Sequence, residues 1–250
     1  VELKKLLIFT PLEITIIALI FTWIGFVRTG LGFGGSVIGL PILMLVGGSP
    51  IDWLPIIGIH LLFFSSITLA NALKQVDWSY FKKSIPWILP AKIVGVIGLL
   101  SFPSSVMIII VYSITSFYAI SWILNMQISP RKNWVNRLLL ILGGYISGTS
   151  MNGGALLVAV YTQNIEAKKL RNTLFVLWFL LVSMKMSAFI VADIYIDWQF
   201  SLLLLPLAGL GHYMGLKTHD KIIVNDAKFK RWMGSGLLLV CVVGVLKIAD

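Results

Sequence analysis

The sequence has few acidic residues and a single cysteine. Its 250 residues include 10 Asp and Glu against 20 Lys and Arg, so the formal net charge is +10, and only 12% of the residues are charged. The one cysteine, Cys241 in LLLVCVVGV, has no partner for an internal disulfide. We therefore expect no disulfide framework, and we expect Cys241 to be a lipid-facing or packed apolar residue.

The sequence also lacks the short motifs of common enzymes. It contains no H-E-x-x-H, G-x-S-x-G, Walker A or C-x-x-C pattern, and its histidines (His60, His212 and His219) lack metal-ligand spacing. We predict that the protein is not an enzyme and that it needs no metal or cofactor. An intramembrane hydrolase is the enzymatic alternative.

Long apolar runs are abundant. Hydrophobic residues make up 58% of the chain, and the mean hydropathy is +0.94. Residues 6–27 read LLIFTPLEITIIALIFTWIGFV, with Glu13 as the only charge. As a helix this run spans roughly 33 Å, enough to cross a hydrocarbon core of about 30 Å. This run is too long for the apolar region of a signal peptide, and no small-residue cleavage site follows it.

The hydropathy pattern predicts an all-α integral membrane protein with a single polytopic membrane domain over residues 1–250. About ten apolar segments are expected. The second and seventh are too short to cross alone, and each follows a glycine-rich break. The expected segments are residues 6–27, 34–46, 53–73, 80–100, 103–124, 134–150, 153–162, 170–192, 198–216 and 229–248.

The first glycine-rich break, RTGLGFGG (28–35), satisfies the G-x-G-x-x-G pattern of dinucleotide-binding folds. That pattern is informative only after a strand and before a helix. Because a membrane-length apolar run precedes it here, we reject a nucleotide site. Any energy for the protein's work must then come from ion or substrate gradients, or from a partner subunit.

The excess of Lys and Arg over Asp and Glu is concentrated in loops on one side of the predicted membrane topology. One side has only Lys4, Lys5 and Lys247, and its connecting loops have no cations, which by the positive-inside rule places that side outside the cytoplasm. We therefore expect both termini outside, a multi-pass protein of the cell membrane, and no nucleic-acid partner. The cytoplasmic cations would be Lys74, Lys82, Lys83, Arg131, Lys132, Arg137, Lys168, Lys169, Arg171, Lys217, Lys221, Lys228, Lys230 and Arg231.

Arg28, Lys92 and Lys185 lie within or at the ends of apolar segments instead. A cation at the centre of a membrane helix costs about 2.5–3.5 kcal/mol on insertion scales. Acidic partners are nearly absent from the segments, since only Glu13 lies in one. A bound small anion is therefore the expected counter-charge.

The two halves of the chain resemble one another. GFVRTGLGFGG (25–35) aligns with GYISGTSMNGG (144–154), and the segment opening at Asp77-Trp78 aligns with that opening at Asp197-Trp198, which places Lys92 on His212. Because each half, about 6–124 and about 134–248, has an odd number of segments, we predict two inverted five-segment repeats. Inverted repeats with broken helices are typical of transporters that bind substrate near the midplane.

The repeated glycine element, the short apolar segment after it and the D-W dipeptides resemble the sulfite exporter TauE/SafE family. GLGFGGSVIGLPIL (30–43) is similar to the first glycine-rich motif of that family, whereas SMNGGA departs from its second. The resemblance implies a secondary transporter, an exporter of a sulfur-containing anion such as sulfite or an organosulfonate. An anion channel, a carrier of another small anion or carboxylate, and a membrane scaffold are the alternatives.

The candidate substrate site combines backbone N–H groups at the helix restarts with the intramembrane cations. Arg28 has a second interpretation as an interfacial anchor, His212 as a packed histidine, and Arg171 as a topology anchor; His60 is expected to be packed. Protons or another ion are candidates for coupling through His212, and an oligomer is compatible with the sequence. The expected substrate-binding residues are Arg28, Gly32, Gly34, Gly35, Lys92, Asn152, Gly153, Gly154, Lys185 and His212.

Overall fold

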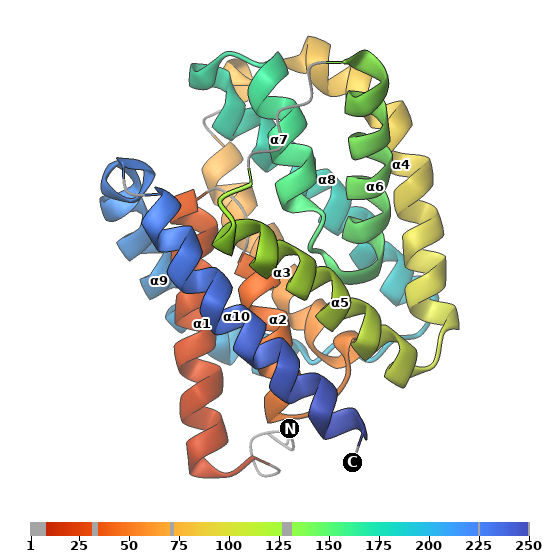
Figure 1. Cartoon of the computed structure of the whole chain (residues 1–250), viewed down its shortest axis with the longest axis vertical. Coiled ribbons are helices and arrows are strands. Elements are labelled where there is room, and N and C mark those ends of the chain that lie inside the picture. Colours follow the sequence, from red (N-terminus) through yellow and green to blue (C-terminus); the bar gives the residue numbers. More distant parts are fainter. Residues whose placement is uncertain (1–8, 32–34, 71–72, 127–131, 225, 250) are drawn as a thin grey trace. The chain divides into compact units, whose positions relative to one another are not determined.

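The computed structural model describes residues 9–31, 35–70, 73–126, 132–224 and 226–249, with side chains described except at 219–230 and 248–249. Every regular element in these ranges is a helix (Figure 1). The order is α1 (Pro11–Leu31), α2 (Gly35–Val46), α3 (Pro50–Leu69), the short 3-10 helix η1 (Leu73–Gln75), α4 (Trp78–Ser101), α5 (Ser104–Ile123), α6 (Asn133–Ser150), α7 (Gly154–Asn164), α8 (Ala167–Val191), α9 (Trp198–Val224) and α10 (Asp226–Ala249). The expectation of an all-helical chain is confirmed.

Five helices among the described residues are long and apolar enough to cross a membrane: α3, α4, α5, α8 and α1 as far as Gly30. Large apolar side chains are also exposed on their outer faces, including Leu12, Ile97, Ile109 and Ile190. An apolar exterior on apolar helices is what a lipid-facing surface requires. The helices α2 and α7, with 12 and 11 residues, are short, as the sequence predicts.

Acidic residues cap the helix starts instead of pairing with membrane cations. Thr10 and Glu13 form a capping box at α1, where the Thr10 backbone N–H donates to Glu13 Oε2 over 2.7 Å. Asp77 accepts from the Tyr80 N–H at the start of α4, and Asp197 accepts from the Phe200 N–H at the start of α9, both over 2.9 Å. Glu13, expected inside the first segment, therefore lies in the first turn of α1.

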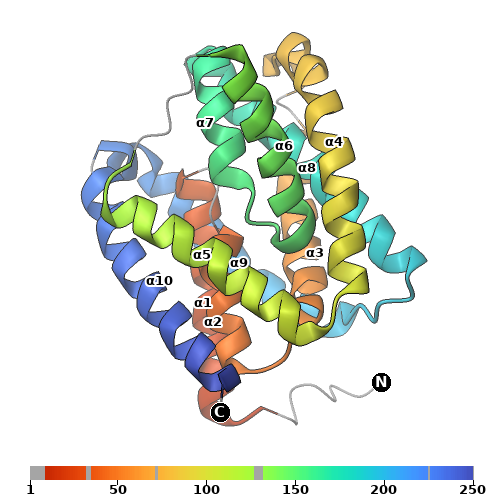
Figure 2. The same cartoon turned by 45° about the vertical axis from the view of Figure 1, so that its right-hand side comes forward.

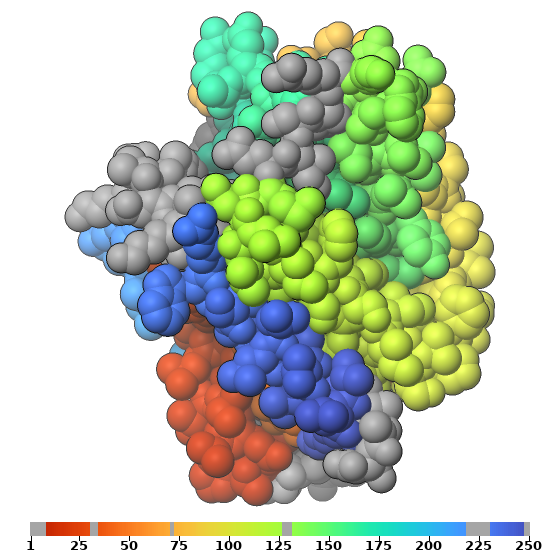
Figure 3. Space-filling view, in the orientation of Figure 1, coloured from red at the N-terminus to blue at the C-terminus, as the bar shows by residue number. Residues whose placement is uncertain are grey.

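The chain folds as two compact units that interleave in sequence. The first unit contains Val1–His60, Pro103–Met126 and Tyr195–Asp250, and thus α1, α2, the start of α3, α5, α9 and α10. In this unit α1 packs along α9, and α10 packs along α5. The helices α10 and α5 run side by side in Figures 1 and 3.

The second unit contains Leu61–Phe102 and Gln127–Ile194, and thus the end of α3, η1, α4, α6, α7 and α8. The helices α4 and α6 form its main pair, and both α7 and α8 pack in the same unit (Figure 2). Its core joins all four helices through buried side chains such as Ile88, Leu140, Leu157 and Leu177.

The main pair in each unit is held close by glycine. A Cβ on Gly25 of α1 would overlap the Ala208 carbonyl oxygen of α9, and a Cβ on Gly144 of α6 would overlap the Ile88 carbonyl oxygen of α4. Small residues let apolar helices approach until their backbones touch, which gains dispersion energy where no hydrophobic effect operates. The glycines therefore set the spacing on which the neighbouring cations depend.

Candidate functional site

The three cations expected inside the membrane are all buried. Lys92 and Lys185 are 0% exposed and Arg28 is 4% exposed. Lys92 lies in α4 and Lys185 in α8, so both belong to the second unit, whereas Arg28 belongs to the first. Arg28 lies in the last turn of α1, which extends past the predicted end at residue 27, and its side chain is buried.

Lys92 binds the end of α6. Its Nζ donates to the Ser147 carbonyl oxygen over 3.2 Å and lies 3.0 Å from Ser147 Oγ. That carbonyl also accepts from the Met151 N–H, and Met151 closes the helix in the left-handed region at φ 59°. The last carbonyls of a helix carry partial negative charge, so an ammonium group is favourable there.

Lys185 has no such support. Among the described residues its Nζ has no hydrogen-bond partner. Lys92 on α4 and Lys185 on α8 belong to helices that pack against each other, so two positive charges there would repel. An isolated buried ammonium carries a desolvation penalty of several kcal/mol. The second unit therefore holds two buried lysines that a small anion would stabilise together.

The break between α6 and α7 lies beside Lys92. Asn152 is 0% exposed, and neither Oδ1 nor Nδ2 has a partner among the described residues. Gly153 is the N-cap of α7 and makes no side-chain cap, so the first N–H groups of α7 have no capping side chain. Such N–H groups, with the positive end of the helix dipole, suit a negatively charged ligand.

Gly153 itself has a packing role. A Cβ at this position would overlap the Gly143 carbonyl oxygen and would lie 2.7 Å from the Ser147 backbone nitrogen of α6. Gly35, at the start of α2, is similarly close to α1, because its Cβ would lie 2.9 Å from the Ile24 carbonyl oxygen. Glycine at these two positions is therefore explained by packing, and ligand binding is not needed to explain it.

The first unit contains the corresponding break between α1 and α2. Arg28 Nη1 donates to the His60 carbonyl oxygen over 3.1 Å, and His212 Nδ1 lies 2.6 Å from Thr29 Oγ1. His60 is buried, with Nε2 2.7 Å from the Ser201 carbonyl oxygen, so its predicted role as a packed, hydrogen-bonded residue is confirmed. Gly32 and Gly34 lie outside the described residues.

The candidate residues thus separate into two groups. Lys92, Asn152, Gly153, Gly154 and Lys185 belong to the second unit. Arg28, Gly35 and His212 belong to the first.

Two hydroxyl residues were missed by the sequence analysis. Ser147 binds Lys92, and Thr29 binds His212. The repeat contained a usable signal, because GFVRTGLGFGG and GYISGTSMNGG place Ser147 opposite Arg28, beside the aligned glycines. Hydroxyl residues in the last turns before the glycine-rich breaks were therefore candidates for the same site as the cations.

No carboxylate reaches the buried lysines among the residues with described side chains. Asp52 lies in the first turn of α3 and accepts from the Ser49 N–H and hydroxyl over 2.8 Å. Glu166 pairs with Lys168 over 3.0 Å at the exposed start of α8, and that contact holds the pKa of Glu166 below its usual value. The described residues also contain no cluster of side chains that would hold a metal.

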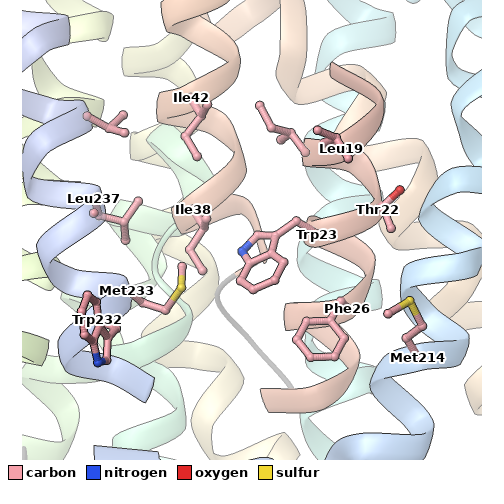
Figure 4. Close-up of a pocket in the computed structure, with 13 residues that line it drawn as sticks. Leu19, Thr22, Trp23, Phe26, Ile38, Ile42, Met214, Trp232, Met233 and Leu237 are labelled. Atoms are coloured by element: carbon pink, nitrogen blue, oxygen red, sulfur yellow. The ribbon is translucent and has the colours of Figure 1, made fainter. Parts of the chain in front are cut away.

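The first unit contains an apolar cavity. It has a volume of about 540 Å³ and is lined from α1, α2, α9 and α10 of the first unit, with Trp23, Phe26 and Leu237 among its walls (Figure 4). A smaller polar pocket of about 110 Å³ lies in the second unit, beside Lys83, Ser84 and Arg137. Neither lining includes Lys92, Lys185 or Asn152.

Two buried lysines without a carboxylate, beside a broken apolar helix, point to a carrier of small anions. Residues 17–244 match the family model of the sulfite exporter TauE/SafE. The chain belongs to the TauE/SafE family. Comparison with curated proteins and with solved structures finds no match. TauE/SafE membership and the five apolar helices identify a multi-pass membrane protein of a transporter family. The TauE/SafE match covers both glycine-rich breaks and all three buried cations.

Proposed function

We propose that the protein is a secondary transporter of the cell membrane that exports a small sulfur-containing anion, such as sulfite or an organosulfonate. The observation that carries the proposal is the pair of buried lysines in the second unit, of which Lys185 has no hydrogen-bond partner and neither is reached by a carboxylate among the described residues. A small oxyanion supplies the missing negative charge and accepts hydrogen bonds from the amines. Family membership supports the choice of sulfur-containing anions.

The proposed ligands in the second unit are Lys92, Lys185, Asn152 and the N–H groups that open α7. The Asn152 amide, buried and unpartnered among the described residues, supplies a donor to one substrate oxygen. The sequence-based expectation that Arg28, Gly35 and His212 contribute from the break before α2 stays a prediction, as does binding near the midplane.

We also propose that the two halves are inverted repeats. In support, each main helix pair takes one helix from each half, α1 with α9 and α6 with α4. Gly25 and Gly144 occupy aligned positions, and each meets a backbone carbonyl two residues after the aligned prolines Pro206 and Pro86. Lys92 and His212, also aligned, each bind a hydroxyl residue near the end of the facing helix.

A thermal-shift screen of the purified protein against sulfite, sulfate, thiosulfate, methanesulfonate and acetate tests the function. A ligand that binds only the folded state raises the apparent melting temperature by mass action. We expect a sulfur oxyanion to stabilise the protein and Lys185→Met to weaken its affinity roughly 10- to 150-fold, as for loss of a charge-assisted hydrogen bond. Asn152→Asp, which adds a negative charge at the same size, should abolish the shift.

Lys82→Met is the matched control, because Lys82 is exposed on α4, the helix that carries Lys92. It should bind as the wild type does. The proposal fails if none of the anions stabilises the wild type, or if Lys185→Met and Lys82→Met bind equally well. Flux that rises linearly with anion concentration would identify a channel instead.

A further inference from the structure

The two buried lysines of the second unit differ in what surrounds their amines. Lys92 Nζ has two acceptors, the carbonyl oxygen and the hydroxyl of Ser147, at 3.2 and 3.0 Å. Lys185 Nζ, equally buried, has none among the described residues. Only Lys92 therefore has acceptors that stabilise an ammonium group.

The elements packed on α8 do not compensate a charge on Lys185. Contacts in this unit join α8 to α4, α7 and η1. Their titratable groups are Tyr80, Lys82, Lys83 and Lys92 on α4, Tyr161 on α7 and Lys74 on η1. None is a carboxylate, and Asp77 just before α4 contacts α8 only through its N–H at Thr173, about 18 Å along the helix from Lys185. A charged Lys92 on the packed helix α4 would add like-charge repulsion. Without an anion, an uncharged amine at Lys185 avoids both the desolvation cost and this repulsion.

An anion bound by both lysines changes that balance. Its negative charge attracts both amines and supplies acceptors to a Lys185 ammonium, which has three N–H donors. The favourable state with anion bound therefore carries one more proton than the empty state. The proton is given up by the acid form of the buffer in the surrounding solution and is held by the amine lone pair, and no bond within the anion forms or breaks.

We propose that Lys185 takes up a proton when the anion binds, so that the proton is the ion coupled to this transporter. The inference rests on the proposed function, because it requires an anion at these lysines. It assigns coupling to Lys185 in the second unit, whereas the sequence favoured His212, whose Nδ1 already lies 2.6 Å from Thr29 Oγ1.

Calorimetric titration of the purified protein with methanesulfonate or thiosulfate, whose charge is constant near neutral pH, tests the coupling. The apparent binding enthalpy is measured in two buffers of different ionisation enthalpy at one pH. If protons are taken up, the two apparent binding enthalpies differ by the number of protons multiplied by the difference in buffer ionisation enthalpy. We expect about one proton taken up per anion. Equal enthalpies in the two buffers overturn the inference and leave the proposed function intact.

Three variants assign the proton. Lys185→Arg keeps a charge that does not titrate, so it should bind the anion without proton uptake. Lys185→Met should bind more weakly, also without uptake, and it covers the case in which the larger arginine prevents folding. Lys82→Met should behave as the wild type.

Uptake that persists in Lys185→Met, or that disappears in His212→Gln and persists in Lys185→Arg, would overturn the assignment. No binding heat in the wild type, for any anion of the thermal-shift screen, would contradict the proposed function together with this inference.

Discussion

Lys92 and Lys185 are two residues of one type at equal burial with different consequences for stability. The Lys92 amine donates to the carbonyl and hydroxyl oxygens of Ser147 near the end of α6, where a positive charge interacts favourably with the helix dipole. Lys185 has no acceptor among the described residues, so folding gains nothing from its amine. A buried cation that does not stabilise the fold, inside an apolar segment where its charge costs free energy, is typical of a functional site.

Substituting each lysine by methionine should therefore shift stability in opposite directions. Lys185→Met replaces an unpartnered amine with an apolar chain of similar length, and we expect the ligand-free protein to unfold at a higher temperature. Lys92→Met leaves the Ser147 hydroxyl and carbonyl without their donor and should lower the free energy of unfolding by about 1–3 kcal/mol. Thermal unfolding in detergent, without anions, measures both. A lower melting temperature for Lys185→Met would show that its amine has a partner in the folded protein.

Glycine acts at the scale of whole elements by setting the distance between paired helices. The α4–α6 pair meets at Gly144, and the α1–α9 pair meets at Gly25, in each case against a backbone carbonyl that cannot move aside. The Lys92–Ser147 contact crosses the first of these pairs. The distance between α4 and α6 therefore also determines whether Lys92 can reach Ser147.

Gly144→Ala should destabilise the protein, because its new Cβ meets the Ile88 backbone. We expect a loss of roughly 1–3 kcal/mol, typical of overpacking in a tight core. Gly236→Ala in α10 is the control, since a Cβ there meets nothing within 4 Å. Alanine restricts the unfolded chain and should stabilise by roughly 0.5–1 kcal/mol. Chemical or thermal unfolding of the two variants compares them, and equal effects would refute close packing at Gly144.

The distribution of cations sets orientation at the scale of the molecule. The helix α8 spans from an exposed basic start at Lys168 to a turn at Asp193, which has φ 52°. The positive-inside rule predicts that Lys168 is cytoplasmic and that the turn at Asp193 is outside. The length and apolar composition of α8, which suit a membrane span, are consistent with ends on opposite sides.

Single cysteines at the two ends of α8 test this orientation. Ala192→Cys should react with a membrane-impermeant thiol reagent added to intact cells, and Lys168→Cys should react only after permeabilisation. The native Cys241 is buried and should stay unlabelled in either case, which the parent protein checks directly. The reverse labelling pattern would invert the proposed topology without affecting the repeat.

The membrane class, the helix positions and the family followed from local properties. Apolar runs long enough to cross lipid, glycine-rich breaks and the lack of carboxylates are readable one segment at a time, because the bilayer requires each span to satisfy its own backbone. For the same reason Lys92 and Lys185 stood out without a structure. The start of α1 at Pro11 and its continuation through Arg28 were not predictable from hydropathy, which does not register the Thr10–Glu13 cap.

The partners of each buried group were settled only by packing in three dimensions. Nothing in α4 alone distinguishes Lys92, which binds Ser147, from Lys185 of α8, which binds no described residue. Nor does sequence spacing show that Gly153 is needed against Gly143 and Ser147. These differences arise between helices far apart in the chain, where the close approach of two backbones decides which polar atoms find partners and which remain for a ligand.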